Sequence, residues 1–236
     1  VGRRSQSRWS HPTASVFGSF MKQPSSLERM LAGGVVAIIR SPDAGRLVEV
    51  AEALLAGGVT VMEITFTVPR AHQVLEEVAA RLGDRILLGA GTVLDAETAR
   101  IAILAGAEFI VSPVVSREVM ACCRRYSKLS LPGALTPTEI LAAWETGADI
   151  VKVFPSEVTG PAYLKAVRAP LPQVRLMPTG GVTLETAADY LRAGACALGV
   201  GSSLVEPRAI AAGDFARVES LARQFMGILR ETRAGE

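Results

Sequence analysis

Residues 35–66 read VVAIIRSPDAGRLVEVAEALLAGGVTVMEITF, and this stretch decides the fold class. Two short apolar runs rich in β-branched residues, 35–40 and 61–66, flank residues 45–58, in which apolar side chains recur with helical spacing. Two consecutive strands joined by a helical crossover run parallel. The stretch therefore predicts a strand–helix–strand unit with parallel strands.

The same alternation continues along the chain. Similar segments of helical periodicity occupy 95–107, 136–148 and 183–195. The predicted strands are eight in number: 35–40, 61–66, 86–92, 108–113, 129–133, 149–155, 174–181 and 197–203. Eight such units predict an α/β fold of the (β/α)8 TIM-barrel type. An open doubly wound sheet is the alternative, although GAGTV at 89–93 lacks the third glycine and the later acidic residue of a dinucleotide site.

A weak internal repeat favours the closed barrel. A small-residue tripeptide ends a helical segment before every second strand: AGG (56–58), AGA (105–107), TGA (146–148) and AGA (193–195). Glycine is suited to the left-handed residue at the C-terminal end of a helix. A pattern that returns every second unit is typical of a symmetric barrel rather than of an open sheet.

Composition and length predict one barrel domain over residues 25–236 with a small-molecule partner. The chain has 236 residues, of which 49% are hydrophobic and 20% charged, and its formal net charge is +2. Basic residues are scattered, so we expect neither nucleic acid nor a membrane as a partner. Residues 1–24 contain no Asp or Glu and no long apolar run, which predicts a disordered tail. Met21 is a possible natural translation start.

Cysteine and histidine are scarce. The three cysteines, Cys122, Cys123 and Cys196, have no metal-site spacing, and the adjacent pair would bridge only with strain. We expect a reduced, cytoplasmic protein. Two histidines provide almost no material for a zinc site or a Ser-His-Asp triad.

A lysine in the middle of a predicted buried strand points to chemistry. Lys152 lies within DIVKVFP (149–155), and Glu63 lies within the second strand. Side chains alternate across a strand, and strands 2 and 6 stand opposite in an eight-stranded barrel. If both side chains point inward, the carboxyl group and the amine face each other across the barrel mouth.

The alternative is a structural ion pair, or a lysine whose stem is buried while its amine reaches water. Burying a pair costs several kcal/mol per ion, and a parallel strand covered by helices offers no easy route outward. A lysine in such surroundings has a lowered pKa, and a neutral amine attacks a ketone to form a Schiff base. We therefore favour Lys152 as a nucleophile.

Two loops of small residues follow the last two strands. PTGGVTLE (178–185) leads to a predicted helix cap at Thr183, and GVGSS (199–203) follows strand 8. Barrel enzymes commonly hold a phosphate at this place, where glycine lets the backbone approach the ligand closely. Merely tight turns are the alternative.

Six motifs in order now make the chain resemble the 2-keto-3-deoxy-6-phosphogluconate (KDPG) aldolases and their 4-hydroxy-2-oxoglutarate (KHG) relatives. The likeness covers roughly residues 27–230. The motifs are EITFTVP (63–69), GAGTV (89–93), VSP (111–113), KVFP (152–155), PTGGV (178–182) and GVGSSLV (199–205). The resemblance implies a class I aldolase that is a homotrimer, acts on a phosphorylated keto acid to release pyruvate, and needs neither a cofactor nor a metal.

The resemblance also implies roles for individual residues. Lys152 would form the Schiff base, and Glu63 would be the general acid and base. The residues implied around the pyruvyl group are Arg40, Thr67, Thr92, Pro113 and Phe154. Those implied around the phosphate are Gly180, Gly181, Gly201 and Ser202.

One position departs from the family pattern. Well-known members carry an arginine four residues after the glutamate, where this chain has Thr67. A neutral hydroxyl replaces a bidentate cation poorly. Arg40, at the end of strand 1, is the candidate for the missing charge.

Three rival functions remain open from the sequence. They are a 2-dehydro-3-deoxy-6-phosphogalactonate aldolase, an aldolase for unphosphorylated 4-hydroxy-2-oxoglutarate, and a non-catalytic barrel that binds a phosphorylated sugar acid. The first two would use the same lysine. The third could lose the lysine or the glutamate, yet this chain keeps both.

Overall fold

The computed structural model describes residues 24–235, so nearly all of the predicted tail, residues 1–24, lies outside the described part. Within it, short strands and helices alternate, as the sequence predicts. The strands are β1 (Val35–Ile39), β2 (Val61–Thr65), β3 (Leu87–Gly91), β4 (Phe109–Val111), β5 (Leu129–Leu131), β6 (Gly133–Ala134), β7 (Val151–Val153), β8 (Leu176–Pro178) and β9 (Leu198–Val200).

All strand pairs are parallel and together they enclose a barrel. One sheet has the order β5-β4-β3-β2-β1-β9 and the other has the order β6-β7-β8. A bridge between Thr179 and Gly199 joins β8 to β9, while Pro132 alone separates β5 from β6. Proline has no amide hydrogen to donate to a ladder, which accounts for the break. Counted as one, β5 and β6 form the fifth of eight strands, and the predicted (β/α)8 barrel is confirmed.

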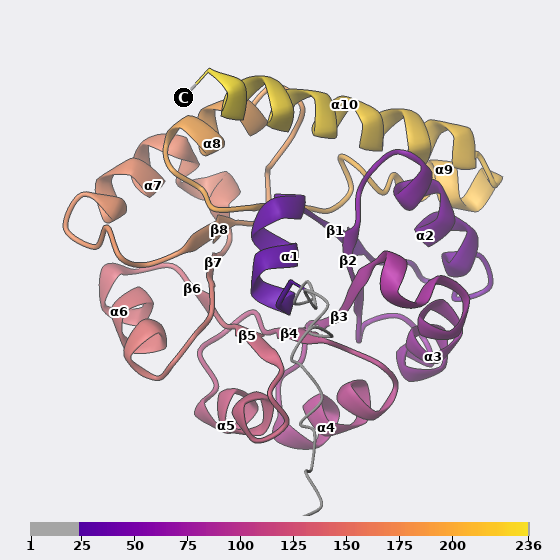
Figure 1. Ribbon diagram of the computed structural model, residues 1–236, viewed down its shortest axis with the longest axis horizontal. Helices are drawn as coiled ribbons and strands as arrows, with labels where there is room; N and C mark the ends of the chain where they lie inside the picture. The colour runs from indigo at the N-terminus through magenta and orange to yellow at the C-terminus, as the bar shows by residue number, and fades with distance from the viewer. Residues whose placement is uncertain (1–23, 236) are drawn as a thin grey trace, which may run out of the picture.

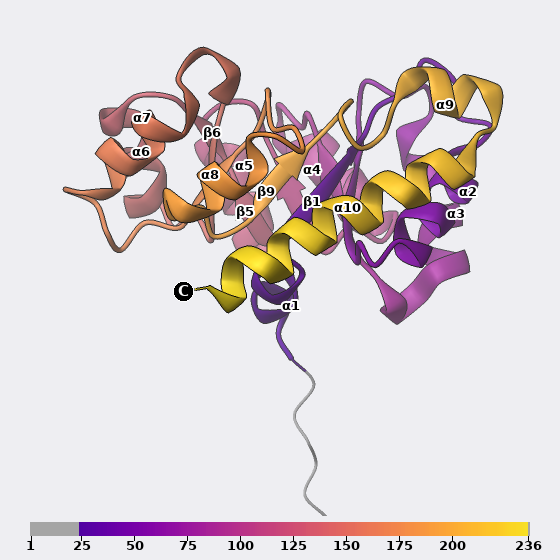
Figure 2. The same ribbon diagram turned by 90° about the horizontal axis from the view of Figure 1, so that it is seen from above.

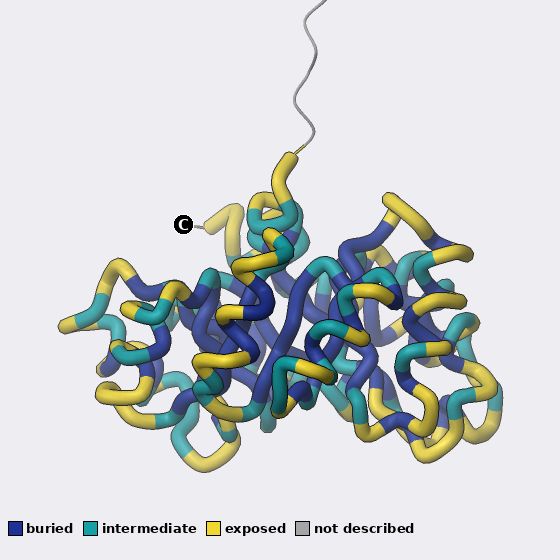
Figure 3. The backbone as a smooth tube through the Cα atoms, turned by 90° about the horizontal axis from the view of Figure 1, so that it is seen from below, coloured by how far each residue is buried: buried dark blue, intermediate teal, exposed yellow. Residues whose placement is uncertain are grey.

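Helices surround the barrel, as Figure 1 shows. The helices along the outer wall are α2 (Leu47–Ala56), α3 (Ala71–Leu82), α4 (Ala96–Leu104), α5 (Arg117–Arg125), α6 (Pro137–Glu145), α7 (Gly160–Arg168), α8 (Ala187–Arg192), α9 (Pro207–Ala212) and α10 (Phe215–Ala234). Single 3-10 turns, Gly83–Arg85 and Ser156–Val158, lie before β3 and after β7. The buried backbone forms the barrel wall in Figure 3, and exposed residues lie outside it.

The repeated tripeptides end helices as predicted. In each tripeptide the glycine that follows the helix has a positive φ value: Gly58 (93°), Gly106 (105°), Gly147 (98°) and Gly194 (93°). Each turns the chain from a helix toward the next strand. The sequence repeat therefore reflects a turn that recurs in every second unit.

A helix that the sequence reading did not predict closes the end of the barrel where the strands begin. Helix α1 (Ser26–Gly33) lies across the centre of the barrel in Figure 1 and below it in Figure 2. Its Met30 is buried in a cluster at that end. The other members are Val36, Val61, Leu87, Phe109, Val111, Leu131, Ile150, Met177 and Ala197. Arg233 of α10 donates hydrogen bonds to the carbonyls of Leu31 and Ala32, which hold α1 in place.

The predicted start of the eighth helix is wrong. Helix α8 begins at Ala187 rather than next to Thr183, and its N-cap residue Thr186 makes no capping hydrogen bond with its side chain. The hydroxyl of Thr186 instead accepts a hydrogen bond from the Thr183 amide, at 2.9 Å. The carbonyl of Thr183 accepts from the amides of Thr186 and Ala187. A separate turn therefore precedes a short helix.

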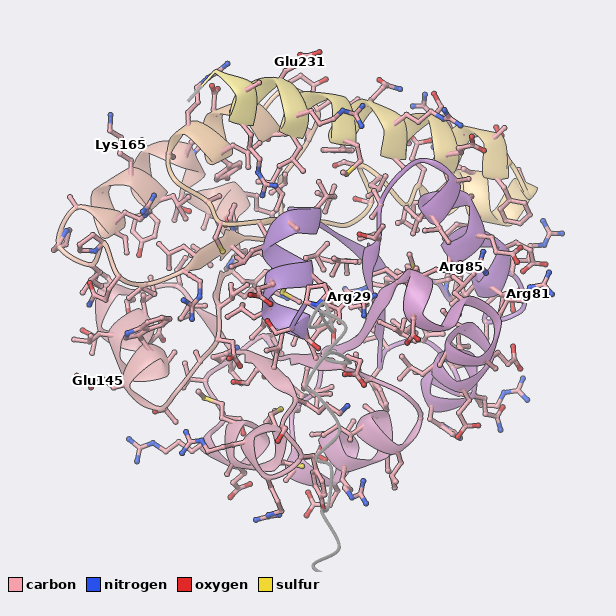
Figure 4. All side chains as sticks on the ribbon, viewed as in Figure 1. Arg29, Arg81, Arg85, Glu145, Lys165 and Glu231 are labelled. Carbon is pink, nitrogen blue, oxygen red and sulfur yellow. The ribbon has the colours of Figure 1, made fainter. Side chains whose placement is uncertain are left out.

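Charged side chains lie on the outer surface. Lys165, Glu145 and Glu231 point outward at the rim in Figure 4. No helix in residues 24–235 is both long and apolar enough to cross a membrane.

Candidate active site

A cavity of about 750 Å³ opens at the end of the barrel where the strands finish. All eleven residues that the sequence reading singled out line it: Arg40, Glu63, Thr67, Thr92, Pro113, Lys152, Phe154, Gly180, Gly181, Gly201 and Ser202. They come from the ends of seven strands or from the loops that follow. Parallel strands of a barrel bring these ends together.

Lys152 lies in the cavity wall with 6% of its surface exposed. On β7 it is in register with Gly133 of β6 and Met177 of β8. Its Nζ atom lies 4.8 Å from the centre of the Phe154 ring, a cation–π distance. Neither of these two neighbours offers the amine a charged group.

Glu63 lies on β2 and is 1% exposed. Neither of its carboxyl oxygens has a hydrogen-bond partner among residues 24–235. A Cβ atom at position 91 would lie 2.2 Å from its Oε1. Glycine at position 91 therefore leaves room for the carboxyl group in this orientation. A buried polar group without partners costs free energy unless a ligand or water completes it.

Burial dominates the protonation of both groups. Loss of hydration raises the pKa of Glu63, and the positive charges of Lys152 and Arg40 offset part of this rise. Loss of hydration lowers the pKa of Lys152, an effect that Glu63 opposes and Arg40 reinforces. No salt bridge joins the two side chains among the described residues. Both shifts favour the neutral forms, an amine beside a carboxylic acid.

Thr67 follows β2 and Thr92 follows the neighbouring strand β3, so both line the same side of the cavity. Thr92 follows β3 and has a φ of 59°, which is unfavourable for a β-branched residue. Such backbone strain concentrates at functional sites. The hydroxyl of Thr67 lies 2.9 Å from that of Thr65, which in turn donates to the carbonyl of Ile39 at 3.3 Å.

The two small-residue loops lie side by side in the cavity wall. Gly180 and Gly181 both have left-handed φ values, 88° and 71°, which a side chain would strain. A Cβ atom on Gly181 would also collide with Glu157, at 2.5 Å from its Cβ. Gly201 and Ser202 follow β9 next to them. The backbone of this region is therefore open to close approach by a ligand.

Ser156, which the sequence reading missed, ties the loop after β7 to the loop after β8. It is 1% exposed, and its hydroxyl donates to the carbonyl of Val153 at 2.7 Å. The same hydroxyl accepts from the amide of Thr179 at 3.2 Å. Its own carbonyl accepts from the hydroxyl of Tyr190 at 3.0 Å. Ser156 thus links the strand that carries Lys152 to the glycine loop.

Other cavity residues also escaped the sequence reading, including Ser41, Pro42 and Glu157, whereas Thr179 and Ser203 belong to the two predicted loops. Glu157 is an exposed carboxylate, and Thr179 has a buried hydroxyl without a partner among the described residues. For Glu157, the KVFP motif two residues earlier was the available signal. Among residues 24–235, no group of three or more His, Cys, Asp or Glu side chains is placed to hold a metal ion.

Fold and cavity together define a barrel enzyme with a buried lysine and a buried carboxyl group at the carboxyl ends of its strands. Comparison with known proteins agrees with this class. The family described as KDPG and KHG aldolase matches residues 27–221.

Two curated relatives are similar over most of the chain. The chain is 40% identical over 208 residues to a 2-dehydro-3-deoxy-phosphogluconate aldolase of Treponema pallidum, which covers 86% of this chain and 96% of the relative. It is 34% identical over 171 residues to a 2-dehydro-3-deoxy-6-phosphogalactonate aldolase of Escherichia coli, covering 72% and 83%.

A solved structure extends the likeness to three dimensions. The KDPG aldolase of Legionella pneumophila, with pyruvate captured as a covalent carbinolamine intermediate, matches with a TM-score of 0.77 at 29% identity, covering 85% of this chain and 97% of that one. The chain belongs to the KDPG and KHG aldolase family. It is a lyase, and the non-catalytic barrel that the sequence left open is not supported.

Proposed function

We propose that the chain cleaves 2-dehydro-3-deoxy-6-phosphogluconate to pyruvate and glyceraldehyde 3-phosphate through a Schiff base on Lys152. The observation that carries the proposal is the burial of this lysine in the cavity, without an ion-pair partner among residues 24–235 and with its pKa lowered by loss of hydration. Neutral amine is the form that attacks a ketone.

The reaction begins at the ketone carbon. The amine of Lys152 attacks C2, the ketone oxygen takes up one proton from the amine and one from solvent and leaves as water, and an iminium ion forms. Glu63 as carboxylate takes the proton of the C4 hydroxyl, directly or through a water. The C3–C4 bond breaks, its electron pair moves into the iminium, and the aldehyde leaves. Glu63 then returns the proton to C3 of the enamine, and hydrolysis releases pyruvate and Lys152.

Glu63 suits a group that both accepts and gives a proton. Burial raises the pKa of its carboxyl group, which makes the protonated form more accessible than in an exposed glutamate. Since both oxygens lack partners among the described residues, either can face a water or a substrate hydroxyl. No other acidic side chain in the cavity wall is buried, because Glu157 is exposed.

The two ends of the substrate would bind on different sides of the lysine. Arg40 and Thr92 would hold the carboxylate, and Pro113 and Phe154 would flank the pyruvyl group. The backbone of Gly180, Gly181 and Gly201, with the hydroxyl of Ser202, would hold the phosphate. The left-handed glycine pair supports the phosphate assignment, because it leaves the backbone accessible.

Two further substrates deserve the same assay. The similarity to a phosphogalactonate aldolase favours the C4 epimer as an alternative, and the KHG branch of the family favours 4-hydroxy-2-oxoglutarate. All three would release pyruvate from the same lysine. Relative kcat/KM values on the three compounds will assign the substrate.

We also propose a cytoplasmic homotrimer. Large apolar side chains are exposed on and around α4, at Leu94 (58%), Ile101 (48%) and Leu104 (68%), with Val114 (51%) on the next loop. Exposed apolar side chains gathered on one region favour a protein–protein interface. Sedimentation equilibrium tests the trimer, and a monomeric mass would refute it.

Borohydride reduction in the presence of pyruvate tests the central proposal. Reduction should add a pyruvyl group irreversibly to Lys152, located by peptide mass spectrometry, and should inactivate the enzyme. The variant Lys152→Met should stay unmodified. An adduct on another lysine, or no adduct on the wild-type chain, would refute the mechanism.

A further inference from the structure

A chain of two hydroxyl groups runs from the cavity to the end of β1. Thr67 lines the cavity, and its Oγ1 lies 2.9 Å from Oγ1 of Thr65. Thr65 is fully buried, and its Oγ1 lies 3.3 Å from the carbonyl oxygen of Ile39. The three groups form one connected sequence of hydrogen bonds.

The direction of these hydrogen bonds follows from the chemistry of the last member. A carbonyl oxygen can only accept, so the single proton of the Thr65 hydroxyl goes to Ile39. In the contact between the two threonines, Thr67 must then be the donor. The one proton of the Thr67 hydroxyl is therefore already used.

A hydroxyl in this state offers the cavity lone pairs and no proton. A substrate carboxylate is itself an acceptor, so it gains no hydrogen bond from Thr67 in this arrangement. To bind it, Thr67 would have to release Thr65 and leave a fully buried hydroxyl with fewer partners. Thr67 thus does not take over the role of the arginine that stands at this position in well-known family members.

The far end of the chain reaches the residue that carries the charge. The carbonyl of Ile39 belongs to the peptide group that joins Ile39 to Arg40, so fixing this carbonyl fixes the plane from which Arg40 extends. The Arg40 side chain itself is exposed, lines the cavity, and makes no hydrogen bond or ion pair within the described residues. Its direction therefore depends on its backbone.

We propose that Thr67 is a positioning residue, which holds the Ile39–Arg40 peptide through Thr65 so that Arg40 meets the substrate carboxylate. This inference rests on the proposed Schiff-base function. It assigns to Thr67 an action through Arg40 rather than a contact with the substrate.

A double-mutant cycle separates the two roles. The quantity measured is the pyruvate concentration that gives half-maximal borohydride trapping. Thr67→Val should raise it about three- to ten-fold in the wild-type background, as expected for one hydrogen bond. With Arg40→Ala already present, the same change should raise it less than about two-fold, because the residue it positions is absent. An equal effect in both backgrounds would overturn the proposal.

Two further variants distinguish a positioning role of Thr67 from a purely structural one. Thr67→Ser keeps the hydroxyl and should restore wild-type trapping. Thr65→Val breaks the same chain but frees the proton of Thr67, so the proposal expects weaker pyruvate binding, whereas a directly binding Thr67 would give equal or tighter binding. If Thr65→Val does not fold, the cycle with Thr67→Val still decides.

Failure of this inference is distinguishable from failure of the proposed function. If the wild-type chain gives no pyruvyl adduct on Lys152, the Schiff-base function itself is wrong. If the wild type and Thr67→Ser are trapped normally while Thr67→Val acts independently of Arg40, only the positioning role is wrong.

Discussion

The two ends of the barrel differ in the polarity of their buried side chains. Where the strands begin, α1 covers an apolar cluster that includes Met30 and Phe109, both fully buried. Where the strands finish, the cavity wall contains a buried lysine, a buried carboxyl group without partners among residues 24–235, and a threonine in a strained backbone conformation. The closed end stabilises the fold, whereas the open end gives up stability for chemistry.

The replacement Lys152→Met should separate the two ends most sharply. It removes the nucleophile, and activity should fall by about 10⁴-fold or more. The free energy of unfolding should not fall, because methionine fills the same apolar space without the cost of burying an amine. Steady-state kinetics and chemical denaturation measure the two effects.

A matched control is Lys165→Met on the exposed face of α7. It should leave kcat unchanged, since Lys165 points away from the barrel (Figure 4). A Lys152→Met protein that is much less stable than the wild type would contradict the view that this end costs stability.

Glu63→Gln should lower kcat by about 10²- to 10⁴-fold, the usual contribution of a general acid or base. Because the amide cannot carry a proton between C4 and C3, the pyruvate adduct on Lys152 should still form while cleavage slows. Persistent adduct formation with slow cleavage is the pattern that separates Glu63 from Lys152. Wild-type cleavage rates in the variant would remove Glu63 from the mechanism.

The same variant has a pH-dependent effect on stability. Burial raises the pKa of Glu63 above its ordinary value of 4.5, so the folded chain holds this proton more tightly than the unfolded chain. The resulting stabilisation is fully present below about pH 4.5 and is lost as pH rises through the folded pKa. The wild type should therefore lose unfolding free energy relative to Glu63→Gln as pH rises. Denaturation curves at several pH values test the sign.

Phe109→Ala probes the closed end. Removal of this fully buried ring should lower the free energy of unfolding by about 3–5 kcal/mol. At a temperature where the variant stays folded, kcat should be close to that of the wild type, because Phe109 lies in the cluster beneath α1.

Phe154→Ala, the same substitution at the open end, should affect substrate binding rather than stability. Phe154 is 36% exposed and touches the amine of Lys152. Phe154→Ala should raise KM for the substrate and change stability little. Similar profiles for the two phenylalanine variants would contradict the division between the ends.

Local patterns predicted most of the fold and most of the residues in the cavity wall. The strands and the left-handed Gly58 and Gly147 follow from short-range rules, and strand alternation turns Glu63 and Lys152 inward. Helix α1 escaped prediction although its capping box, Ser25 with Glu28, is a recognisable signal. What a helix covers depends on distant strands, which one sequence does not reveal.

The hydrogen bonds of the site could not be predicted from the sequence. Sequence reading placed Thr67 against the substrate, yet it could not see that Thr65 and Ile39 use its proton. Likewise, Thr183 fits the pattern of a helix cap, but its amide donates to the hydroxyl of Thr186 and α8 begins only at Ala187. Such choices depend on differences of about 1 kcal/mol between alternative hydrogen bonds, which residue types alone do not decide.

Ser156→Ala should give the smallest effect and test the connection within the open end. The change removes two hydrogen bonds of the hydroxyl, to the carbonyl of Val153 and from the amide of Thr179. The Thr179 amide keeps a second acceptor in Val153, at 3.0 Å, so the loss should amount to about 1 kcal/mol. The glycine loop should then sit less firmly against the end of β7.

If that loop holds the phosphate, KM for the phosphorylated substrate should rise about two- to five-fold in Ser156→Ala, while borohydride trapping with pyruvate stays at the wild-type level. Pyruvate lacks the phosphate and so does not sense the loop. Ser130→Ala is the matched control, because Ser130 is equally small and buried but lies on β5 outside the cavity wall. The Ser156 hydroxyl contacts both the strand that carries Lys152 and the loop after β8. Weaker trapping of pyruvate in Ser156→Ala would therefore mean that Ser156 positions Lys152 rather than the phosphate loop.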